Sequence, residues 1–187
     1  MIDKTAQVSK LTQIGRNVKI WGLTRIREGV VVGDNTTVGG NVYIDHDVKI
    51  GSNVKIEDSA LIYHGVTIED EVFIGPAVCF TNDKYPRATY EGKLKKDRDW
   101  QVSETLVARG ASIGAGCVIA PGVKIGRYAM IGAGSVVTTS IPDSGLAWGN
   151  PAKLHGFVCP NGHPLKIKGN SDKKSHCRRC GKTYKIK

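Results

Sequence analysis

Apolar residues recur at every sixth position from Val8 to Phe80, and this period constrains the fold more than any other feature of the sequence. The thirteen positions are Val8, Ile14, Ile20, Ile26, Val32, Val38, Ile44, Ile50, Ile56, Ile62, Ile68, Ile74 and Phe80. A second series, two positions earlier and running from Val18 to Val78, is almost wholly small or β-branched. A period of six scatters side chains around a helix, whereas a strand alternation with a turn in every hexad produces it directly.

Turn-forming residues separate the expected strands, as at Gly33-Asp34-Asn35 and Gly51-Ser52-Asn53. Three hexads make one triangular coil, and successive coils stack through parallel ladders roughly 4.8 Å apart. The stiff branched side chains fill the interior. The sequence therefore predicts a mainly β chain built as a parallel β-helix of hexapeptide repeats. An ordinary β-sandwich would have no reason to keep one register through thirteen repeats.

The repeat stops after Phe80 and restarts at Val107, and this step is not a multiple of six. We therefore expect a loop at residues 81–106 that leaves and rejoins a β-helix spanning residues 1–141. Long irregular loops in compact domains are usually functional, although some are tolerated surface excursions. A connecting segment (142–157) and a small, zinc-ribbon-like basic tail (158–187) complete the expected organisation.

The net charge of +10 is distributed very unevenly along the chain. Residues 1–150 carry 17 basic and 16 acidic residues, whereas residues 151–187 carry ten basic residues and one acid, Asp172. The sequence has neither a charged-then-apolar leader nor an apolar run of about 18 residues, so we expect a cytoplasmic protein without a membrane segment. Three of the five cysteines cluster near the end, which favours a metal site in a reducing compartment over a disulfide framework.

His46, His64 and Asn82 follow one another at intervals of three hexads, so the coil period predicts that they form a ladder at one corner, ending where the loop departs. Histidine titrates near neutral pH and can accept a proton from an attacking amine. The ladder is therefore a candidate catalytic site, although a corner histidine is often only a solvated turn residue. Three carboxylates are near enough in sequence to orient an imidazole: Asp45, Asp47 and Glu69.

A second ladder is expected in the late coils, where Gly114-Ala115-Gly116 and Gly132-Ala133-Gly134 are also three hexads apart. Two layers without bulky side chains let a ligand approach the backbone amides closely. A long thin ligand such as pantetheine would fit such a surface. Tight corner geometry explains the same glycines equally well.

The tail contains two short motifs that could together bind a metal ion. Cys159 and His163 form the first, Cys177 and Cys180 form the second, and residues 164–176 separate them. Four such ligands could hold a tetrahedral Zn²⁺ in a closed, structural site, which would help a polar segment of this size to fold. His176 could replace His163, and a flexible basic tail with free thiols is the alternative.

Three motifs carry a resemblance to a known family: Phe80-Thr-Asn-Asp-Lys-Tyr-Pro-Arg87, Ile131-Gly-Ala-Gly-Ser-Val-Val137 and Gly149-Asn-Pro-Ala-Lys153. Over residues 1–157 the chain resembles the left-handed hexapeptide-repeat acyltransferases. It most resembles the N-acetyltransferases that act on the 3-amino group of UDP- or dTDP-linked sugars. The left hand of the coil comes from this resemblance alone.

The resemblance implies a homotrimer with an active site between each pair of neighbouring chains. Acetyl-CoA would lie along the late coils beside Ala115 and Ala133, with its phosphates near Lys153. Asn82 would lie at the reacting centre with His64 as general base, although some relatives leave the proton to the substrate. The residues expected to bind the sugar nucleotide are His46, Asp83, Tyr85 and Arg87.

The resemblance thus implies acetyl-CoA-dependent N-acetylation of a nucleotide-linked amino sugar, for synthesis of a surface-polysaccharide precursor. One alternative is a non-enzymatic scaffold whose tail binds a polyanion, although nucleic acid is not an expected partner. The other alternative is a metal hydratase with the same fold, similar to the γ-class carbonic anhydrases. Those need three histidines across a trimer interface, two of them close in sequence within one chain, whereas His46 and His64 are a full coil apart and His155 lies beyond the coils.

Overall fold

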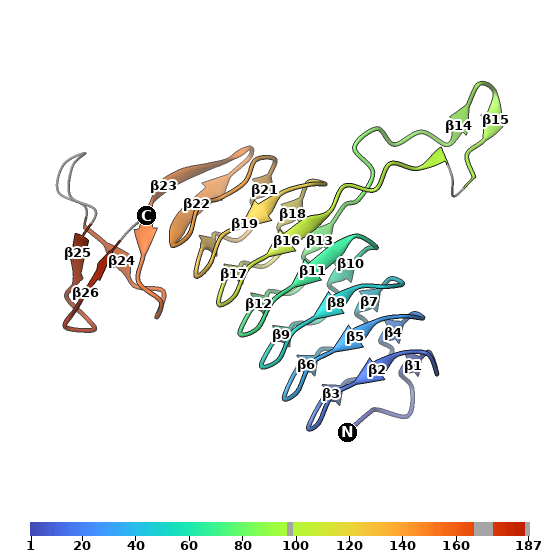
Figure 1. Cartoon of the computed structure of the whole chain (residues 1–187), viewed down its shortest axis with the longest axis horizontal. Coiled ribbons are helices and arrows are strands. Elements are labelled where there is room, and N and C mark those ends of the chain that lie inside the picture. The colour runs from blue at the N-terminus through green and yellow to red at the C-terminus, as the bar shows by residue number, and fades with distance from the viewer. Residues whose placement is uncertain (97–98, 167–173, 186–187) are drawn as a thin grey trace.

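The computed structural model describes residues 1–96, 99–166 and 174–185, and it confirms the predicted parallel β-helix (Figure 1). Two-residue strands build most of three sheets, here called faces A, B and C, which the chain visits in turn. The described residues contain no α-helix, and so no helix that could cross a membrane. The handedness of the coil stays a prediction from the resemblance.

Face A contains β3 (Lys19–Ile20), β6 (Thr37–Val38), β9 (Lys55–Ile56), β12 (Phe73–Ile74), β17 (Ser112–Ile113), β20 (Met130–Ile131), β22 (Gly145–Gly149), β23 (Ala152–Val158) and β24 (Pro164–Leu165). Face B contains β1 (Gln7–Val8), β4 (Arg25–Ile26), β7 (Tyr43–Ile44), β10 (Leu61–Ile62), β13 (Cys79–Phe80), β18 (Val118–Ile119) and β21 (Val136–Val137). Face C contains β2 (Gln13–Ile14), β5 (Val31–Val32), β8 (Lys49–Ile50), β11 (Val66–Ile68), β16 (Thr105–Val107) and β19 (Lys124–Ile125). Turns between these strands form the A/B, B/C and C/A corners.

The strand register follows the predicted coil of three hexads. Arg25 pairs with Tyr43 on face B, for example, and Lys49 with Thr67 on face C. Across the inserted loop Phe73 pairs with Ser112, so the loop lengthens one coil without disturbing the stack. The inserted loop occupies residues 81–104, because β16 already begins at Thr105. It carries a hairpin of β14 (Thr89–Tyr90) and β15 (Lys93–Leu94), which projects from the solenoid (Figure 1).

Both predicted apolar series form the core. Every member from Val18 to Phe80 is buried, and the later positions Val107, Ile113, Ile119, Ile125, Ile131 and Val137 continue it. Two threonines of the second series remain inside because their hydroxyls have partners: Thr24 Oγ1 donates to the carbonyl of Gly39 at 2.6 Å, and Thr36 Oγ1 donates to that of Gly51 at 2.9 Å. Each buried Ile or Val contributes about 1.5–3 kcal/mol through its removal from water.

The C-terminal part extends face A and then leaves it. β22 pairs in parallel with β20, and β23 folds back antiparallel on β22 with an irregular register between Leu146 and Ala147. β23 ends at the buried Val158, so we use the name ribbon for the residues from Cys159 onward. The ribbon contains β24 and the antiparallel pair β25 (Lys174–Cys177) and β26 (Lys182–Lys185), at one end of the long axis (Figure 1).

Candidate functional site

The predicted ladder of His46, His64 and Asn82 is present at the B/C corner. The two imidazole rings stack with centroids 4.0 Å apart and an angle of 20° between planes. Asn82 Nδ2 donates to the carbonyl of His64 at 3.3 Å, so the amide continues the ladder into the inserted loop. His64 Nδ1 lies 3.0 Å from the carbonyl oxygen of His46. Because a carbonyl only accepts, this contact places the proton of a neutral ring on Nδ1 and leaves Nε2 as an acceptor.

Two of the three candidate carboxylates have separate roles. Asp47 Oδ2 contacts Nδ1 of His46 at 3.0 Å, and this hydrogen bond lowers the pKa of Asp47. Glu69 instead accepts a hydrogen bond from the backbone of Arg109, so it does not orient either ring. Asp47 is therefore the carboxylate that orients the ring of His46.

Asp45 is a buried carboxylate that fixes the backbone of the same corner. It accepts hydrogen bonds from the N–H groups of His46 at 2.9 Å and His64 at 3.3 Å, and it pairs with Arg27 Nη1 at 2.9 Å. Burial raises the pKa of Asp45, but the two N–H groups and the neighbouring side chains outweigh burial and hold that pKa below its usual range. The carboxylate therefore remains charged and holds both histidine turns in place.

Gly65 allows the inserted loop to close over this corner. Its φ is +89°, and a Cβ there would lie 2.5 Å from Cγ1 of Val102, so glycine is required for this approach. The two ends of the loop meet through the N–H of Ser103, which donates to the carbonyl of Asn82 at 3.2 Å, and through a bridge between Asp83 and Val102. Asn82 thus sits at the base of the loop, beside the histidines.

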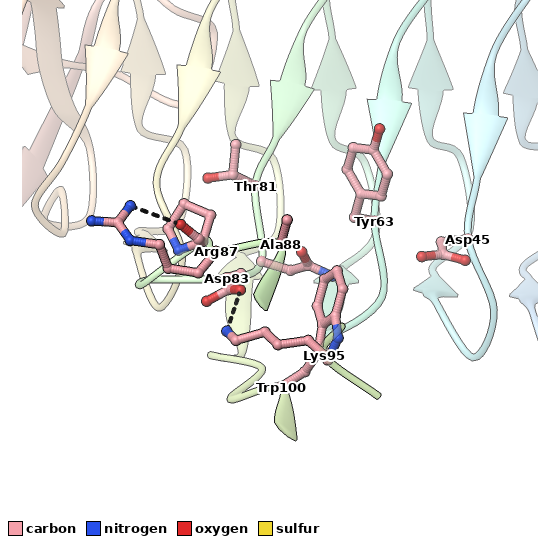
Figure 2. Close-up of a pocket in the computed structure, with 10 residues that line it drawn as sticks. Asp45, Tyr63, Thr81, Asp83, Arg87, Ala88, Lys95 and Trp100 are labelled. Atoms are coloured by element: carbon pink, nitrogen blue, oxygen red, sulfur yellow. Dashed lines mark hydrogen bonds and ion pairs between the residues drawn. The ribbon is translucent and has the colours of Figure 1, made fainter. Parts of the chain in front are cut away.

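The inserted loop and the B/C corner enclose a pocket of about 760 Å³, a size typical of small-molecule sites. Its lining consists of Asp45, Tyr63, Thr81, Asn82, Asp83, Pro86, Arg87, Ala88, Lys95 and Trp100. Figure 2 shows Tyr63 and Thr81 on adjacent coils, with Lys95 and Trp100 reaching in from the loop. An ion pair of 3.5 Å between Lys95 and Asp83, both largely buried, braces the loop from within.

Several predicted loop residues reach the pocket, and some pocket residues were not predicted. Asn82, Asp83 and Arg87 line it, whereas Tyr85 is 67% exposed and lies outside the lining. Neither histidine lines the pocket: His64 lies behind Asn82, and His46 stacks on His64 one coil further away. The residues missed by sequence reasoning are Tyr63, Thr81, Pro86, Ala88, Lys95 and Trp100. Tyr63 and Thr81 immediately precede ladder members, which was an available signal.

The second predicted ladder lies at the A/B corner, on the opposite edge of face B. The N–H of Gly134 donates to the carbonyl of Ala115 at 2.8 Å, which places Ala133 directly above Ala115. Both alanines are exposed, and Cβ atoms added at Gly116 and Gly134 would meet nothing within 4 Å. The surface along this corner is therefore smooth and open, as expected for a strip that a thin ligand could follow.

An aromatic stack closes the C-terminal end of this strip. The rings of Trp148 and His155 lie 3.8 Å apart and are nearly parallel, and Trp148 is 44% exposed. A Cβ on Gly132 would lie 2.8 Å from Cβ of Trp148, so glycine is required beneath the tryptophan. Lys153 pairs with Trp148 across β22 and β23. His155 thus lies at a different corner from the histidine ladder, and the chain does not bring it to the other two histidines as a carbonic-anhydrase site would require.

The outward row of face B begins with Gln7 and the charged Arg25, and from Tyr43 onward, between the two ladders, it carries no charge. This uncharged row, placed side by side by the strand register, is Tyr43, Leu61, Cys79, Val118 and Val136. The equivalent rows on the other faces contain lysines over the same coils: Lys55 on face A, and Lys49 and Lys124 on face C. Burial raises the pKa of the Cys79 thiol, which keeps this position neutral as well.

The four predicted metal ligands converge in the ribbon. The ligand atoms of Cys159, His163, Cys177 and Cys180 all lie within 4.8 Å of one another. The sulfur atoms of Cys159 and Cys180 are 3.7 Å apart. A zinc tetrahedron with Zn–S bonds of about 2.3 Å has edges of about 3.8 Å, so this spacing suits zinc. His176 is exposed and contacts Thr183, which leaves His163 as the histidine of the cluster.

The charge of one ligand in the cluster also suits a cation, whereas burial raises the pKa of its neighbour Cys159. Burial raises the pKa of Cys177, but the N–H groups of Cys180 and Arg179 and the side chains of Cys180 and His163 lower it to about 6. A thiolate is the form that binds zinc. The residues present therefore fit a tetrahedral zinc site.

The family model described as bacterial transferase hexapeptide (six repeats) matches residues 11–46, 47–82 and 104–139, which is more than half of the chain. The chain belongs to the bacterial transferase hexapeptide family. The matched segments of this hexapeptide transferase stop at the inserted loop and resume after it, in agreement with the strand register. The predicted family resemblance is thereby confirmed.

Among curated proteins, the hexapeptide transferase is 54% identical over 81 residues to the dTDP-3-amino-3,6-dideoxy-α-D-galactopyranose 3-N-acetyltransferase of Aneurinibacillus thermoaerophilus. That alignment covers 43% of this chain and 40% of the relative. The galactoside O-acetyltransferase of Lactococcus lactis is 34% identical over 83 residues, 44% of this chain and 39% of that protein. The chain therefore spans about two fifths of these curated relatives.

A solved structure with the same fold is the acetyltransferase domain of PglB from Neisseria gonorrhoeae in complex with acetyl coenzyme A. It superimposes with a TM-score of 0.52 and is 21% identical, with 82% of this chain and 56% of that chain covered. At this identity the likeness concerns the fold alone.

Proposed function

We propose that the protein is an acetyl-CoA-dependent N-acetyltransferase that acts on the amino group of a nucleotide-linked amino sugar. The observation that carries the proposal is the ladder of His46, His64 and Asn82, which ends in the pocket under the inserted loop. The similarity to the Aneurinibacillus 3-N-acetyltransferase supports a 3-amino sugar on dTDP as the acceptor. A surface-polysaccharide precursor is the product class that this acceptor suggests.

The chemistry is the attack of an amine on the acetyl thioester. The amine nitrogen forms a bond to the acetyl carbon, and the thiolate of CoA leaves. His64 Nε2 takes the proton that the nitrogen loses, because Nδ1 is committed to the carbonyl of His46. Asn82, fixed through its Nδ2 to the carbonyl of His64, positions the amine or stabilises the developing oxyanion.

The sugar nucleotide occupies the pocket of about 760 Å³. Arg87 supplies a guanidinium for the diphosphate, since its contact in the structure is to the carbonyl of Pro86 and not to a carboxylate. His46 supports His64 from below and does not contact the acceptor directly. Tyr85 joins the binding surface only through its exposed ring at the rim of the loop.

The donor follows the A/B corner, with pantetheine along Ala115 and Ala133 and the phosphates near Lys153. The exposed ring of Trp148, backed by His155, offers the adenine a flat apolar surface. This corner and the histidine corner lie on opposite edges of face B. A single chain therefore cannot join donor to acceptor, and a second copy must complete the site.

A homotrimer with face B turned inward satisfies this requirement. Threefold rotation brings the B/C corner of each chain to the A/B corner of the next, and it buries the uncharged row between them. Apolar rows exposed on a sheet face are typical of such interfaces.

The trimer can be tested on the uncharged row itself. Replacing the outward, half-buried Leu61 with glutamate is expected to give monomers, because three carboxylates would otherwise meet near the axis. Light scattering would measure the mass. The matched control is Thr67→Glu, an outward and half-buried position of face C one strand later, which should remain trimeric. A wild-type protein of monomer mass at micromolar concentration would remove the shared-site model.

We infer that the ribbon binds one structural Zn²⁺ through Cys159, His163, Cys177 and Cys180. The four side chains complete a tetrahedron and leave no position for substrate or water, and such closed sites stabilise folding. The ion thus has no part in acetyl transfer.

The function is tested by thiol release from acetyl-CoA with a panel of dTDP- and UDP-linked amino sugars as acceptors. Turnover with a 3-amino sugar that exceeds turnover with its 3-hydroxy counterpart would support the proposal. Thiol release that is equal with and without every acceptor would contradict it.

A further inference from the structure

The ribbon exposes a concentrated positive charge that the proposed reaction does not use. Five side chains make up what we call the basic patch: Lys166, Lys174, Arg178, Arg179 and Lys185. All five are exposed, and none forms an ion pair among the described residues. The sequence from 151 to 187 contains one acid, Asp172, which lies outside the described residues. The solenoid, by contrast, is nearly neutral.

The arrangement of these cations is unfavourable for the ribbon alone. Lys174 and Lys185 pair directly across β25 and β26, where like charges destabilise a sheet. Near the turn between the two strands, Lys166, Arg178 and Arg179 line a hollow of about 200 Å³ with His176. A hollow of this size lined by such side chains suits a phosphate group. These repulsions are relieved when the patch meets an anionic surface.

The ribbon lies away from both edges of face B. Gly162 packs so closely on Met130 of face A that a Cβ would lie 2.7 Å from its Cε. Pro160 lines two hollows together with Tyr128, a residue of the C/A corner. The C/A corner is opposite face B, so the ribbon points outward from a trimer whose B faces meet at the axis.

We propose that the basic patch is a docking surface for an anionic lipid membrane, and that the three patches of a trimer bind it together. The proposal rests on the trimer of the proposed function. The ribbon also lies at one end of the long axis (Figure 1), so a trimer whose B faces meet along that axis carries its three patches at the same end. Clusters of four to eight basic side chains are typical of surfaces that bind acidic lipid headgroups.

A single-stranded nucleic acid is a competing polyanion, and the ribbon suits it less well. Proteins that bind single strands add exposed aromatic rings on which bases stack. The aromatic side chain in the described ribbon, Tyr184, is half buried and packs with the cysteines. Three patches at one end of a trimer also fit a flat surface better than they fit a rod.

The test is co-sedimentation of the full chain with vesicles, in the absence of acetyl-CoA and sugar nucleotide. We expect retention on phosphatidylcholine mixed with phosphatidylglycerol, little retention on phosphatidylcholine alone, and a loss of binding as salt is raised. Lys174→Gln with Lys185→Gln should weaken retention at least about tenfold, and so should Arg178→Gln with Arg179→Gln. The matched control removes two exposed lysines of faces A and C, Lys19→Gln with Lys49→Gln, and should bind normally.

Zinc content and mass would be measured for each variant, so that loss of binding is not confused with loss of the ribbon or the trimer. Equal retention on both vesicle types by a zinc-loaded trimer would overturn the proposal. Tighter binding to duplex DNA than to acidic vesicles at the same salt concentration would also overturn it. Because no reaction is measured, failure of the acetyltransferase assignment would leave the vesicle result intact.

Discussion

Replacing Asn82 with alanine is expected to lower the turnover of acetyl transfer by roughly 30- to 1000-fold. The change removes the amide that lies between His64 and the pocket, and with it about 2–4 kcal/mol of transition-state stabilisation. The measurement is thiol release at saturating acetyl-CoA and acceptor. Because the effect falls on the reacting centre, kcat should fall more than KM rises.

Two comparisons make this result specific to Asn82. Arg87→Ala alters a pocket residue that we assign to binding, so it should raise KM for the acceptor and change kcat little. The melting temperature of Asn82→Ala should stay close to that of the wild type, since the core does not include this side chain. If Asn82→Ala keeps near-normal turnover while His64→Ala abolishes it, acetyl transfer depends on His64 and not on Asn82, contrary to this prediction.

Loss of a single zinc ligand is expected to unfold the ribbon. Structural zinc sites contribute on the order of 10 kcal/mol of apparent binding free energy, which a small polar segment cannot replace. His163→Ala should therefore release the metal at micromolar chelator, whereas the matched variant His176→Ala should retain one zinc per chain. Elemental analysis and the first thermal transition would measure both. A wild-type chain without zinc would contradict the assignment.

We also expect that acetyl transfer does not need the ribbon, because a closed zinc site leaves no position for substrate. A chain that ends after Val158 keeps β23 and the whole of both ladders. It should lose zinc and melt at a lower temperature, yet retain acetyl transfer within about tenfold, or roughly 1.4 kcal/mol. A folded, trimeric truncation without activity would show instead that the ribbon reaches an active site.

The fold was predictable because one physical constraint repeats along the chain. Each stacked coil must present branched side chains inward at the same point, so the period of six determined the register, the core and the corners. The stacking of His46, His64 and Asn82 followed from the same period, and the structure confirms it. The inserted loop was predictable as an interruption, although β16 begins slightly before the expected end of the loop.

What could not be predicted depends on contacts outside the repeat. Lys95 and Trp100 reach the pocket because a buried ion pair with Asp83 and the closure at Gly65 fold the loop back on the solenoid. The period of six residues contains no information about such contacts. The stack of Trp148 on His155 depends on the irregular register between β22 and β23, and spacing alone could not choose between His163 and His176.

The closed base of the inserted loop has a consequence for how this scaffold can diversify. Its ends meet at Asn82 and Ser103, and the coils on either side stack as though the inserted residues were absent. The inserted loop, which forms one wall of the pocket, can therefore change without changing the coils that form the other wall. A loop of different length could give the pocket a different shape, and thus admit a different ligand, while the core and the A/B corner stay the same.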